Sequence, residues 1–197
     1  MTRKYSIIYL PGLGDPHKNE KLLLKIWKLY GIKVQYLPIY WNDHRSFSNK
    51  LNEILNLIDT YTNNGYEVSL IGTSAGASAA LNAFSKRKGV IAKVVCICGK
   101  INNPNTISPV TFKLNPSLRE SLDLLAKSLS EIDTQDRKKI LSLHPVYDEV
   151  VPIKDTYISN ASNKLFISIG HAFSISYSLT IGSYFIVRFI KKAHKNT

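Results

Sequence analysis

The chain has 197 residues, of which 44% are hydrophobic, enough to bury the core of one domain, and this composition excludes an intrinsically disordered chain. Its 26 Lys and Arg residues outnumber its 14 Asp and Glu residues and give a net charge of +12, but the basic residues are scattered along the chain. A generally basic, solvated surface is therefore favoured over a nucleic-acid site, and Lys, Arg or Asn interrupts each apolar run before it reaches the length of a membrane span.

The first third of the chain alternates apolar runs with amphipathic stretches, the pattern of a parallel sheet with connecting helices. We expect strands over residues 6–10 and 32–37. We expect helices over 19–30 and 46–61, where apolar side chains recur at helical spacing. Gly31 is expected to cap the first helix, because helices commonly end on a glycine. The N-terminus carries no signal-peptide pattern, so we expect a cytoplasmic protein.

Ser74 lies between a strand expected over 67–71 and a helix expected over 75–86, with glycines two residues before and two residues after it. A sharp turn here would lift the hydroxyl clear of the sheet, and Gly72 and Gly76 would leave room where strand and helix nearly collide. Serine is a poor nucleophile unless a base removes its proton. This pattern therefore predicts either a nucleophile with a base nearby or a serine that merely caps a helix.

The next strand, expected over 91–98, contains both cysteines of the chain, Cys96 and Cys98. Residues two apart on a strand share one face of the sheet, and in extended backbone they cannot form an ordinary disulfide. We interpret them as buried, reduced packing residues. Further Cys or His at metal-ligand spacing does not follow nearby, so no metal site is predicted.

Residues 99–136 interrupt the alternation of strands and helices. Loop-forming residues come first, and an amphipathic helix then begins with Asn115 as the expected N-cap and Pro116 at the first helical position. Two interpretations stay open for this insertion, namely a small lid over a site or an ordinary surface helix that closes the sheet edge. The whole chain, 1–197, is expected to form one domain.

Asp148 and His171 each follow one of the last two predicted strands. The remaining elements are expected as strands over 139–143 and 164–169 and as helices over 152–159 and 172–192. Sites in parallel sheets form at the edge where the strands end. We therefore expect Asp148, His171 and Ser74 to lie at one common edge.

The chain order serine, acid, histidine, together with the elbow Gly72-Thr73-Ser74-Ala75-Gly76, resembles the α/β-hydrolase family over nearly the whole chain. The resemblance implies a doubly wound α/β fold, with a mainly parallel six-stranded sheet in the order 2-1-3-4-5-6 and helices on both faces. The antiparallel strands that open the sheet in larger relatives are missing, because the first predicted strand begins at once. A small serine hydrolase is what this resemblance implies.

By the same resemblance Ser74 is the nucleophile, His171 takes and returns its proton, and Asp148 holds the imidazole. Glu149 is the alternative acid. In the family the acid precedes a valine-rich segment that ends in proline, here Val150-Val151-Pro152, and this pattern favours Asp148. The other histidines do not follow the last strand behind a glycine; they are His17, His44, His144 and His194.

Cleavage of an acyl group also needs hydrogen-bond donors for the developing oxyanion. The resemblance assigns the backbone N–H groups of Ala75 and Leu13 to this role, with Gly14 as the alternate to Leu13. Relatives often carry a histidine where this chain has Pro11, which removes a side chain that braces the loop and leaves the N–H in place.

These expectations together predict a serine hydrolase that cleaves a small carboxylic ester or thioester through an acyl-enzyme, without a cofactor or a metal. Two alternatives remain. One is an acyltransferase or lipase-like enzyme with the same triad, in the latter case docking on a membrane surface, and the other is a non-catalytic module for an anionic partner. Nucleic-acid binding is not expected, and the oligomeric state stays open. Aromatic residues expected either to contact substrate or to pack in the core are Tyr40, Trp41 and Phe112.

Overall fold

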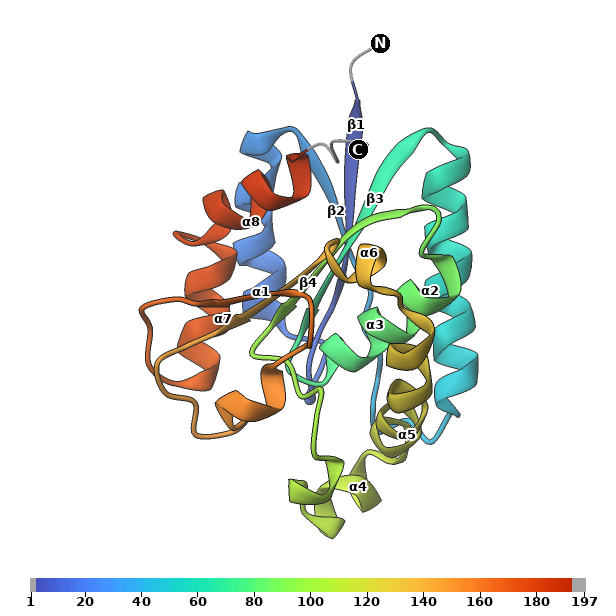
Figure 1. The fold of residues 1–197 in the computed structure, drawn as a ribbon, viewed down its shortest axis with the longest axis vertical. Coiled ribbons are helices and arrows are strands. Elements are labelled where there is room, and N and C mark those ends of the chain that lie inside the picture. Colours follow the sequence, from blue (N-terminus) through green and yellow to red (C-terminus); the bar gives the residue numbers. More distant parts are fainter. Residues whose placement is uncertain (1–2, 193–197) are drawn as a thin grey trace.

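In the computed structural model, which describes residues 3–192, six strands form one sheet (Figure 1). The strands are β1 Lys4–Leu10, β2 Ile32–Tyr36, β3 Tyr66–Thr73, β4 Ile91–Ile97, β5 Ile140–His144 and β6 Ser162–Leu165. Their spatial order is β2-β1-β3-β4-β5-β6, and each neighbouring pair is parallel. The predicted fold class and strand order are therefore confirmed.

Helices cover both faces of this sheet. The α-helices are α1 Lys18–Leu23, α2 Phe47–Asn63, α3 Gly76–Arg87, α4 Pro109–Leu114, α5 Pro116–Glu131, α6 Thr134–Arg137, α7 His171–Leu179 and α8 Ser183–Lys191. The 3-10 helices are η1 Leu24–Tyr30, η2 Pro104–Thr106 and η3 Ile153–Thr156. In Figure 1, α2, α3 and α5 lie on one side of the sheet and α1, α7 and α8 on the other.

The central strands β1, β3 and β4 bury apolar side chains on both faces, which is why their sequences read as largely apolar runs. Ile8 and Leu70 belong to the cluster under α2, α3 and α5. Their neighbours Ile7 and Ile71 belong to the cluster under α7, α8 and η1. Because successive side chains of a strand alternate between faces, each central strand is clamped between two cores. This double burial holds the carboxyl ends of the central strands in place.

The first and last predicted helices differ from the observed ones. The first begins as α1 and continues as the 3-10 helix η1, and Gly31, with φ of 68°, ends it as predicted. The last is broken after Leu179 into α7 and α8, whose axes meet at a bend of 57°. The N–H of Gly182 donates to the carbonyl of Tyr177 at this break (2.8 Å), so a turn replaces the continuous helix.

The elements around the last two strands are shorter than expected. β6 ends at Leu165, and Ile169 forms only an isolated bridge with Tyr147. The helix expected over 152–159 is the single 3-10 turn η3. Much of this part of the chain is therefore loop, stabilised by local hydrogen bonds.

Cys96 and Cys98 are both buried free thiols, as predicted, but they do not share a face. Cys96 packs in the cluster under α2, α3 and α5, and Cys98 packs in the opposite cluster. The reason is that β4 ends at Ile97 and Cys98 has a left-handed φ of 49°, which breaks the alternation.

The insertion contains two different kinds of segment. The longer helix, α5, packs against α3 and buries Leu118, Leu122 and Leu125 in the core, so it belongs to the layer that covers the sheet. Asn115 does not cap α5 through its side chain, because that amide donates to the carbonyl of Thr111 in α4 (3.0 Å). Residues of η2 and α4 border a pocket beside Ser74 instead. Whether this short segment moves as a lid stays a prediction.

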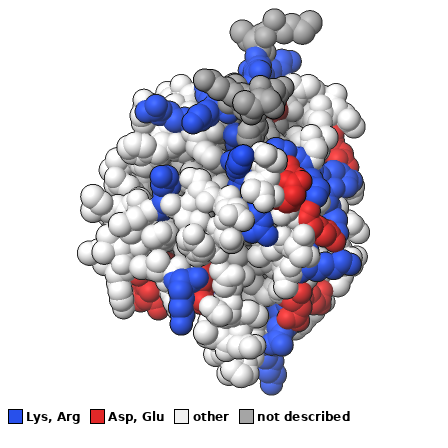
Figure 2. All heavy atoms as spheres, in the orientation of Figure 1, with Lys and Arg blue, Asp and Glu red and all other residues white. Residues whose placement is uncertain are grey.

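In the described part of the chain, no single helix is long and apolar enough to cross a membrane; α7 and α8 reach that length and composition only together, across their bend. The face in Figure 2 shows Lys and Arg side chains in several separate places, with Asp and Glu among them along one side. The basic residues of this face are thus dispersed, as the sequence suggested.

Candidate active site

Ser74 lies in a tight turn between β3 and α3. Its φ of 51° is left-handed, a conformation that costs a non-glycine residue about 1–3 kcal/mol and persists where the surroundings fix it. The turn is fixed by two backbone hydrogen bonds, from the N–H of Ser74 to the carbonyl of Ile97 (3.0 Å) and from the N–H of Lys100 to the carbonyl of Ser74 (3.2 Å). The end of β4 therefore holds the turn in place.

The glycines on either side of Ser74 allow strand and helix to approach closely. A Cβ atom at Gly72 would lie 2.4 Å from the carbonyl oxygen of Gly76. A Cβ atom at Gly76 would lie 2.1 Å from the carbonyl oxygen of Leu10. Both distances are far inside van der Waals contact, so larger residues would force the elements apart. Spatial crowding thus explains the Gly-x-Ser-x-Gly pattern in this chain.

His171 is held by Asp148. The Nδ1 atom of His171 lies 2.8 Å from Oδ2 and 3.0 Å from Oδ1 of Asp148. The N–H groups of Val150 and Val151 donate to Oδ1 of the same carboxylate (2.9 and 2.8 Å). Glu149, the alternative acid, accepts the backbone N–H of His171 instead (3.0 and 3.1 Å). The structure thus pairs the imidazole with Asp148.

These contacts set the charge of Asp148. Burial of its side chain raises the pKa of the carboxyl, but the hydrogen bonds from His171, Val151 and Val150 outweigh burial and hold the pKa below its usual value. The group is therefore a carboxylate at neutral pH. A buried carboxylate on Nδ1 orients the ring and leaves Nε2 directed elsewhere.

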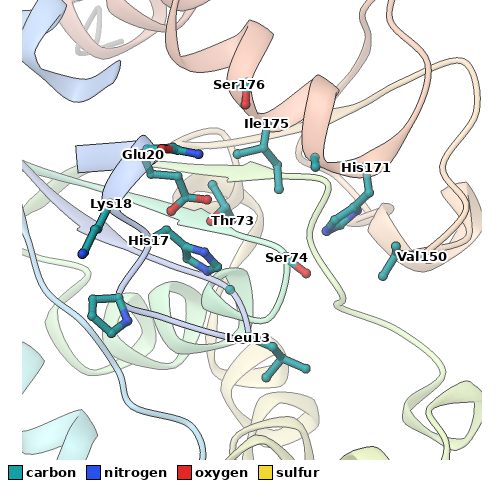
Figure 3. A pocket seen from close by; sticks show the side chains of 14 residues that line it. Leu13, His17, Lys18, Glu20, Thr73, Ser74, Val150, His171, Ile175 and Ser176 are labelled. Atoms are coloured by element: carbon teal, nitrogen blue, oxygen red, sulfur yellow. The ribbon is translucent and has the colours of Figure 1, made fainter. Parts of the chain in front are cut away.

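Ser74 and His171 line the same pocket, and in Figure 3 the serine hydroxyl and the imidazole lie across it from each other. Within residues 3–192 the side chains of Ser74 and His171 form no direct hydrogen bond. The serine and the His171–Asp148 pair therefore share a pocket without a hydrogen bond between them. Of the other histidines, His17 lines the far part of this pocket. His44 lies in an exposed turn and His144 ends β5. His194 lies outside the described residues.

The loop after β1 approaches the turn that carries Ser74. A Cβ atom at Gly12 would lie 2.9 Å from Cβ of Ser74, so only glycine permits this distance. The next residue, Leu13, lines both pockets that Ser74 borders. Neither the N–H of Leu13 nor that of Ala75 donates to another group of the described chain. Both N–H groups are thus available to a ligand bound beside Ser74.

Asp15 and Trp41 brace the loop after β1, which contains Pro11. The buried carboxylate of Asp15 accepts the N–H groups of Ile39 and Tyr40 at 2.5 and 2.8 Å, which ties the loop after β1 to the loop after β2. The indole N–H of Trp41 donates to the carbonyl of Pro11 (3.2 Å). The presence of Pro11 therefore does not leave the loop unsupported.

Two pockets meet at Ser74. The larger, about 520 Å³, extends along α1 and α7. The smaller, about 270 Å³, extends under η2 and toward α5. Ser74, Leu13 and Val150 border both, so a bound molecule can place one part in each pocket with its reacting atom at the serine.

Tyr40, Trp41 and Phe112, the aromatic residues considered for substrate contact, lie outside both of these pockets. Trp41 is 1% exposed and stacks on Phe47 in the core. Phe112 packs against the core and under the guanidinium of Arg119. Tyr40 occupies a turn with φ of 54° on the outside of the loop. Trp41 and Phe112 thus pack in or against the core, whereas Tyr40 is exposed, and a contact of any of the three with substrate stays a prediction.

Cys98, Asp148 and His171 are the group of described residues whose donor atoms could meet on a metal ion, all within 4.8 Å. Burial and the nearby charge of Asp148 raise the pKa of the Cys98 thiol above its usual value. Asp148 already occupies Nδ1 of His171. The geometry fits a hydrogen-bonded pair better than a metal site.

Sequence reasoning missed the polar residues at the far end of the larger pocket, above all Glu20 and His17. Both lie at the start of α1, which the pattern identified only as an amphipathic helix. The signal that could have found them is position, because the residues after β1 in a parallel sheet face the site edge.

No protein-family model and no curated protein sequence matches this chain. Solved structures do. Est1E from Butyrivibrio proteoclasticus shares 14% identity with a TM-score of 0.72, over 96% of this chain and 90% of that one. A metagenome-derived lipolytic enzyme, from work on LipS and LipT, shares 12% sequence identity with a TM-score of 0.70, over 97% of this chain and 95% of that one.

An alpha/beta hydrolase enzyme from the metagenome of sediments of the lagoon of Mar Chica, Morocco, shares 17% identity with a TM-score of 0.61, over 94% of this chain and 92% of that one. At such identities the likeness concerns the fold. The strand order, the turn at Ser74 and these neighbours agree on it. The chain therefore has the α/β-hydrolase fold.

Proposed function

We propose that this protein is a serine hydrolase that cleaves a carboxylic ester or a thioester through an acyl-enzyme. The observation that carries the proposal is the His171–Asp148 hydrogen bond at the edge of a pocket that Ser74 also lines. The fold shared with lipolytic enzymes supports hydrolysis of an acyl bond. A binding module would need neither the strained serine turn nor a buried carboxylate on an imidazole.

In the proposed reaction, Nε2 of His171 takes the proton of Ser74 while the serine oxygen attacks the carbonyl carbon. The carbon–oxygen or carbon–sulfur bond to the leaving group then breaks, and His171 returns the proton to the departing alcohol or thiol. Water repeats the sequence on the acyl-serine and releases the acid. Asp148 keeps the imidazole in the tautomer that leaves Nε2 free and stabilises its protonated form.

The oxyanion of each tetrahedral intermediate would accept hydrogen bonds from the N–H groups of Leu13 and Ala75. Each such donor is worth about 3–4 kcal/mol of transition-state stabilisation. Ala75 is the N-cap of α3, so the partial positive charge of the helix N-terminus adds to the same effect. This role agrees with the lack of another acceptor for either N–H in the described chain.

The test is hydrolysis of p-nitrophenyl acetate by wild type and Ser74→Ala. Loss of the nucleophile is expected to lower kcat/KM by about 10⁴-fold or more. Ser130→Ala is the matched control, because Ser130 is exposed on α5 and, within residues 3–192, its hydroxyl bonds only to the carbonyl of Lys127. Wild-type turnover in the Ser74→Ala variant would refute the proposal.

A further inference from the structure

The larger pocket has a polar end away from Ser74. Figure 3 shows the carboxylate of Glu20 directed into the pocket beside His17 and Thr73, with Ser74 and His171 at the opposite end and Ile175 along one wall. Glu20 lies in the first turn of α1. A molecule bound in this pocket beside Ser74 would therefore extend along an apolar wall toward the carboxylate of Glu20.

The carboxylate of Glu20 lacks a partner for one oxygen. Its Oε2 atom is buried and forms no hydrogen bond within residues 3–192. The neighbouring hydroxyl of Thr73 is already paired with Tyr9 (3.1 Å). A buried acceptor without a donor is destabilising, and more so if it is charged, so a bound donor would recover stabilisation here.

The charges around Glu20 are mixed. Burial raises the pKa of its carboxyl most strongly, and the charge of Asp15 adds to this, whereas His17, a hydrogen bond from the hydroxyl of Tyr9 and His171 lower it. Tyr9 and Tyr36 lie on the neighbouring strands, and Lys18 lies exposed at the pocket rim. Glu20 is the acidic side chain that lines this end of the pocket, and its carboxylate favours a ligand that donates hydrogen bonds or carries positive charge.

The position of His171 shows which half of a substrate would meet Glu20. His171 borders the larger pocket and not the smaller one. A group that returns a proton to the leaving atom must lie within hydrogen-bond reach of it. The smaller pocket is lined mostly by apolar residues, including Ile107, Leu118 and Pro152, which suits an acyl chain. The leaving alcohol therefore belongs in the pocket that contains Glu20.

We propose that Glu20 is a specificity-determining residue that accepts a hydrogen bond from a hydroxyl or ammonium group on the alcohol half of the ester. The substrate class is an ester of a diol, polyol or amino alcohol rather than of a plain alkyl alcohol. This inference rests on the proposed hydrolase function and names the substrate class of the same site.

Three acetates of matched size test it: pentyl acetate, ω-hydroxybutyl acetate and ω-aminobutyl acetate, with longer homologues of each. Wild type is expected to prefer a donor-bearing ester to its alkyl analogue by roughly 10- to 100-fold in kcat/KM, the range for a hydrogen bond to a charged group. Glu20→Leu should lose this preference, so that the ratio of kcat/KM for a donor-bearing ester to kcat/KM for pentyl acetate falls to about one. Glu20→Gln distinguishes the two donors, because an amide oxygen still accepts from a hydroxyl but no longer attracts an ammonium.

The control is Glu53→Gln, since Glu53 lies exposed on α2 and pairs with Arg45 away from the pocket. Equal loss on all three acetates in Glu20→Leu, or no loss on any, would overturn the inference while leaving the hydrolase intact. Failure of wild type to hydrolyse even p-nitrophenyl acetate would contradict the proposed function instead. Ligand-observed NMR of the free diol and amino alcohol, with wild type and Glu20→Leu, tests Glu20 without turnover, and equal binding to both proteins would overturn its role.

Discussion

At the residue scale, Asp148 and Glu149 are neighbours in sequence that hold different parts of His171. Asp148 holds the ring at Nδ1, whereas Glu149 accepts the backbone N–H at the start of α7. The first contact decides which ring nitrogen faces Ser74. The second fixes where α7 begins and so where the ring is attached. The two carboxylates should therefore respond differently to the same amide substitution.

Asp148→Asn is expected to lower kcat on p-nitrophenyl acetate by roughly 10³- to 10⁴-fold, because the amide no longer stabilises the imidazolium or its productive tautomer. Glu149→Gln should keep kcat within about tenfold of wild type, because its amide oxygen still accepts the N–H of His171. Steady-state kinetics of both variants measure the difference. A larger loss in Glu149→Gln than in Asp148→Asn would assign the roles the other way round.

Local pattern could predict the residues that follow from a motif. Ser74 could be predicted as a candidate because the glycines two residues before and after it are needed where strand and helix crowd together. Asp148 and His171 could be predicted because each follows the end of an expected strand. The positions of the Glu20 and Trp41 side chains could not be predicted, because they depend on which way each side chain points after packing. The indole of Trp41 packs inward and donates to Pro11, which sequence spacing does not specify.

At the element scale, a buried ion pair between Lys100 and Asp155 joins the insertion, residues 99–136, to η3. Lys100, 5% exposed, contacts the fully buried carboxylate of Asp155 at 2.5 Å, and Asn103 donates to the same carboxylate. The carbonyl of Asp155 also accepts the N–H groups of Ile101 and Asn102. These contacts join the chain after β4 to η3, between the turn of Ser74 and the loop of Asp148.

Lys100→Met is therefore expected to lower the free energy of unfolding by about 3–5 kcal/mol, because it leaves the carboxylate of Asp155 buried without its counter-ion. Asp123→Asn is the control, since it breaks the exposed pair with Arg119 on α5, which is worth about 0.3–0.5 kcal/mol. Urea denaturation of both variants measures the two losses. Similar small losses would show that the buried pair contributes little.

Element types were more predictable than element ends. Apolar runs identified β1, β3, β4 and β5 because these strands bury side chains on both faces, whereas the edge strands β2 and β6 are only partly buried. The break between α7 and α8 was missed, because one glycine in an apolar stretch does not by itself end a helix and the 57° bend follows from packing. The last strand, predicted over 164–169, is formed by Ser162–Leu165, and the apolar residues Ile167 and Ile169 beyond it are exposed.

At the scale of the whole molecule, the net charge of +12 is not concentrated in one patch on the face that Figure 2 shows. Several basic side chains are paired, among them Arg87 with Asp59 and Lys139 with Asp136. Dispersed charge gives general attraction to polyanions without a defined site.

Fluorescence anisotropy with a short DNA duplex is therefore expected to give a dissociation constant no tighter than about 10⁻⁶ M at physiological salt, the range of non-specific binding. The affinity should fall further as salt rises. A tighter complex that survives high salt, combined with absence of ester hydrolysis, would favour the alternative of a binding module for an anionic partner.

The most direct measurement of the central claim is the site of covalent modification by a fluorophosphonate, read by peptide mass spectrometry. The account predicts one adduct, on the peptide that contains Ser74, absent from Ser74→Ala and strongly slowed in His171→Ala. An adduct on another residue, or equal labelling of wild type and Ser74→Ala, would contradict it.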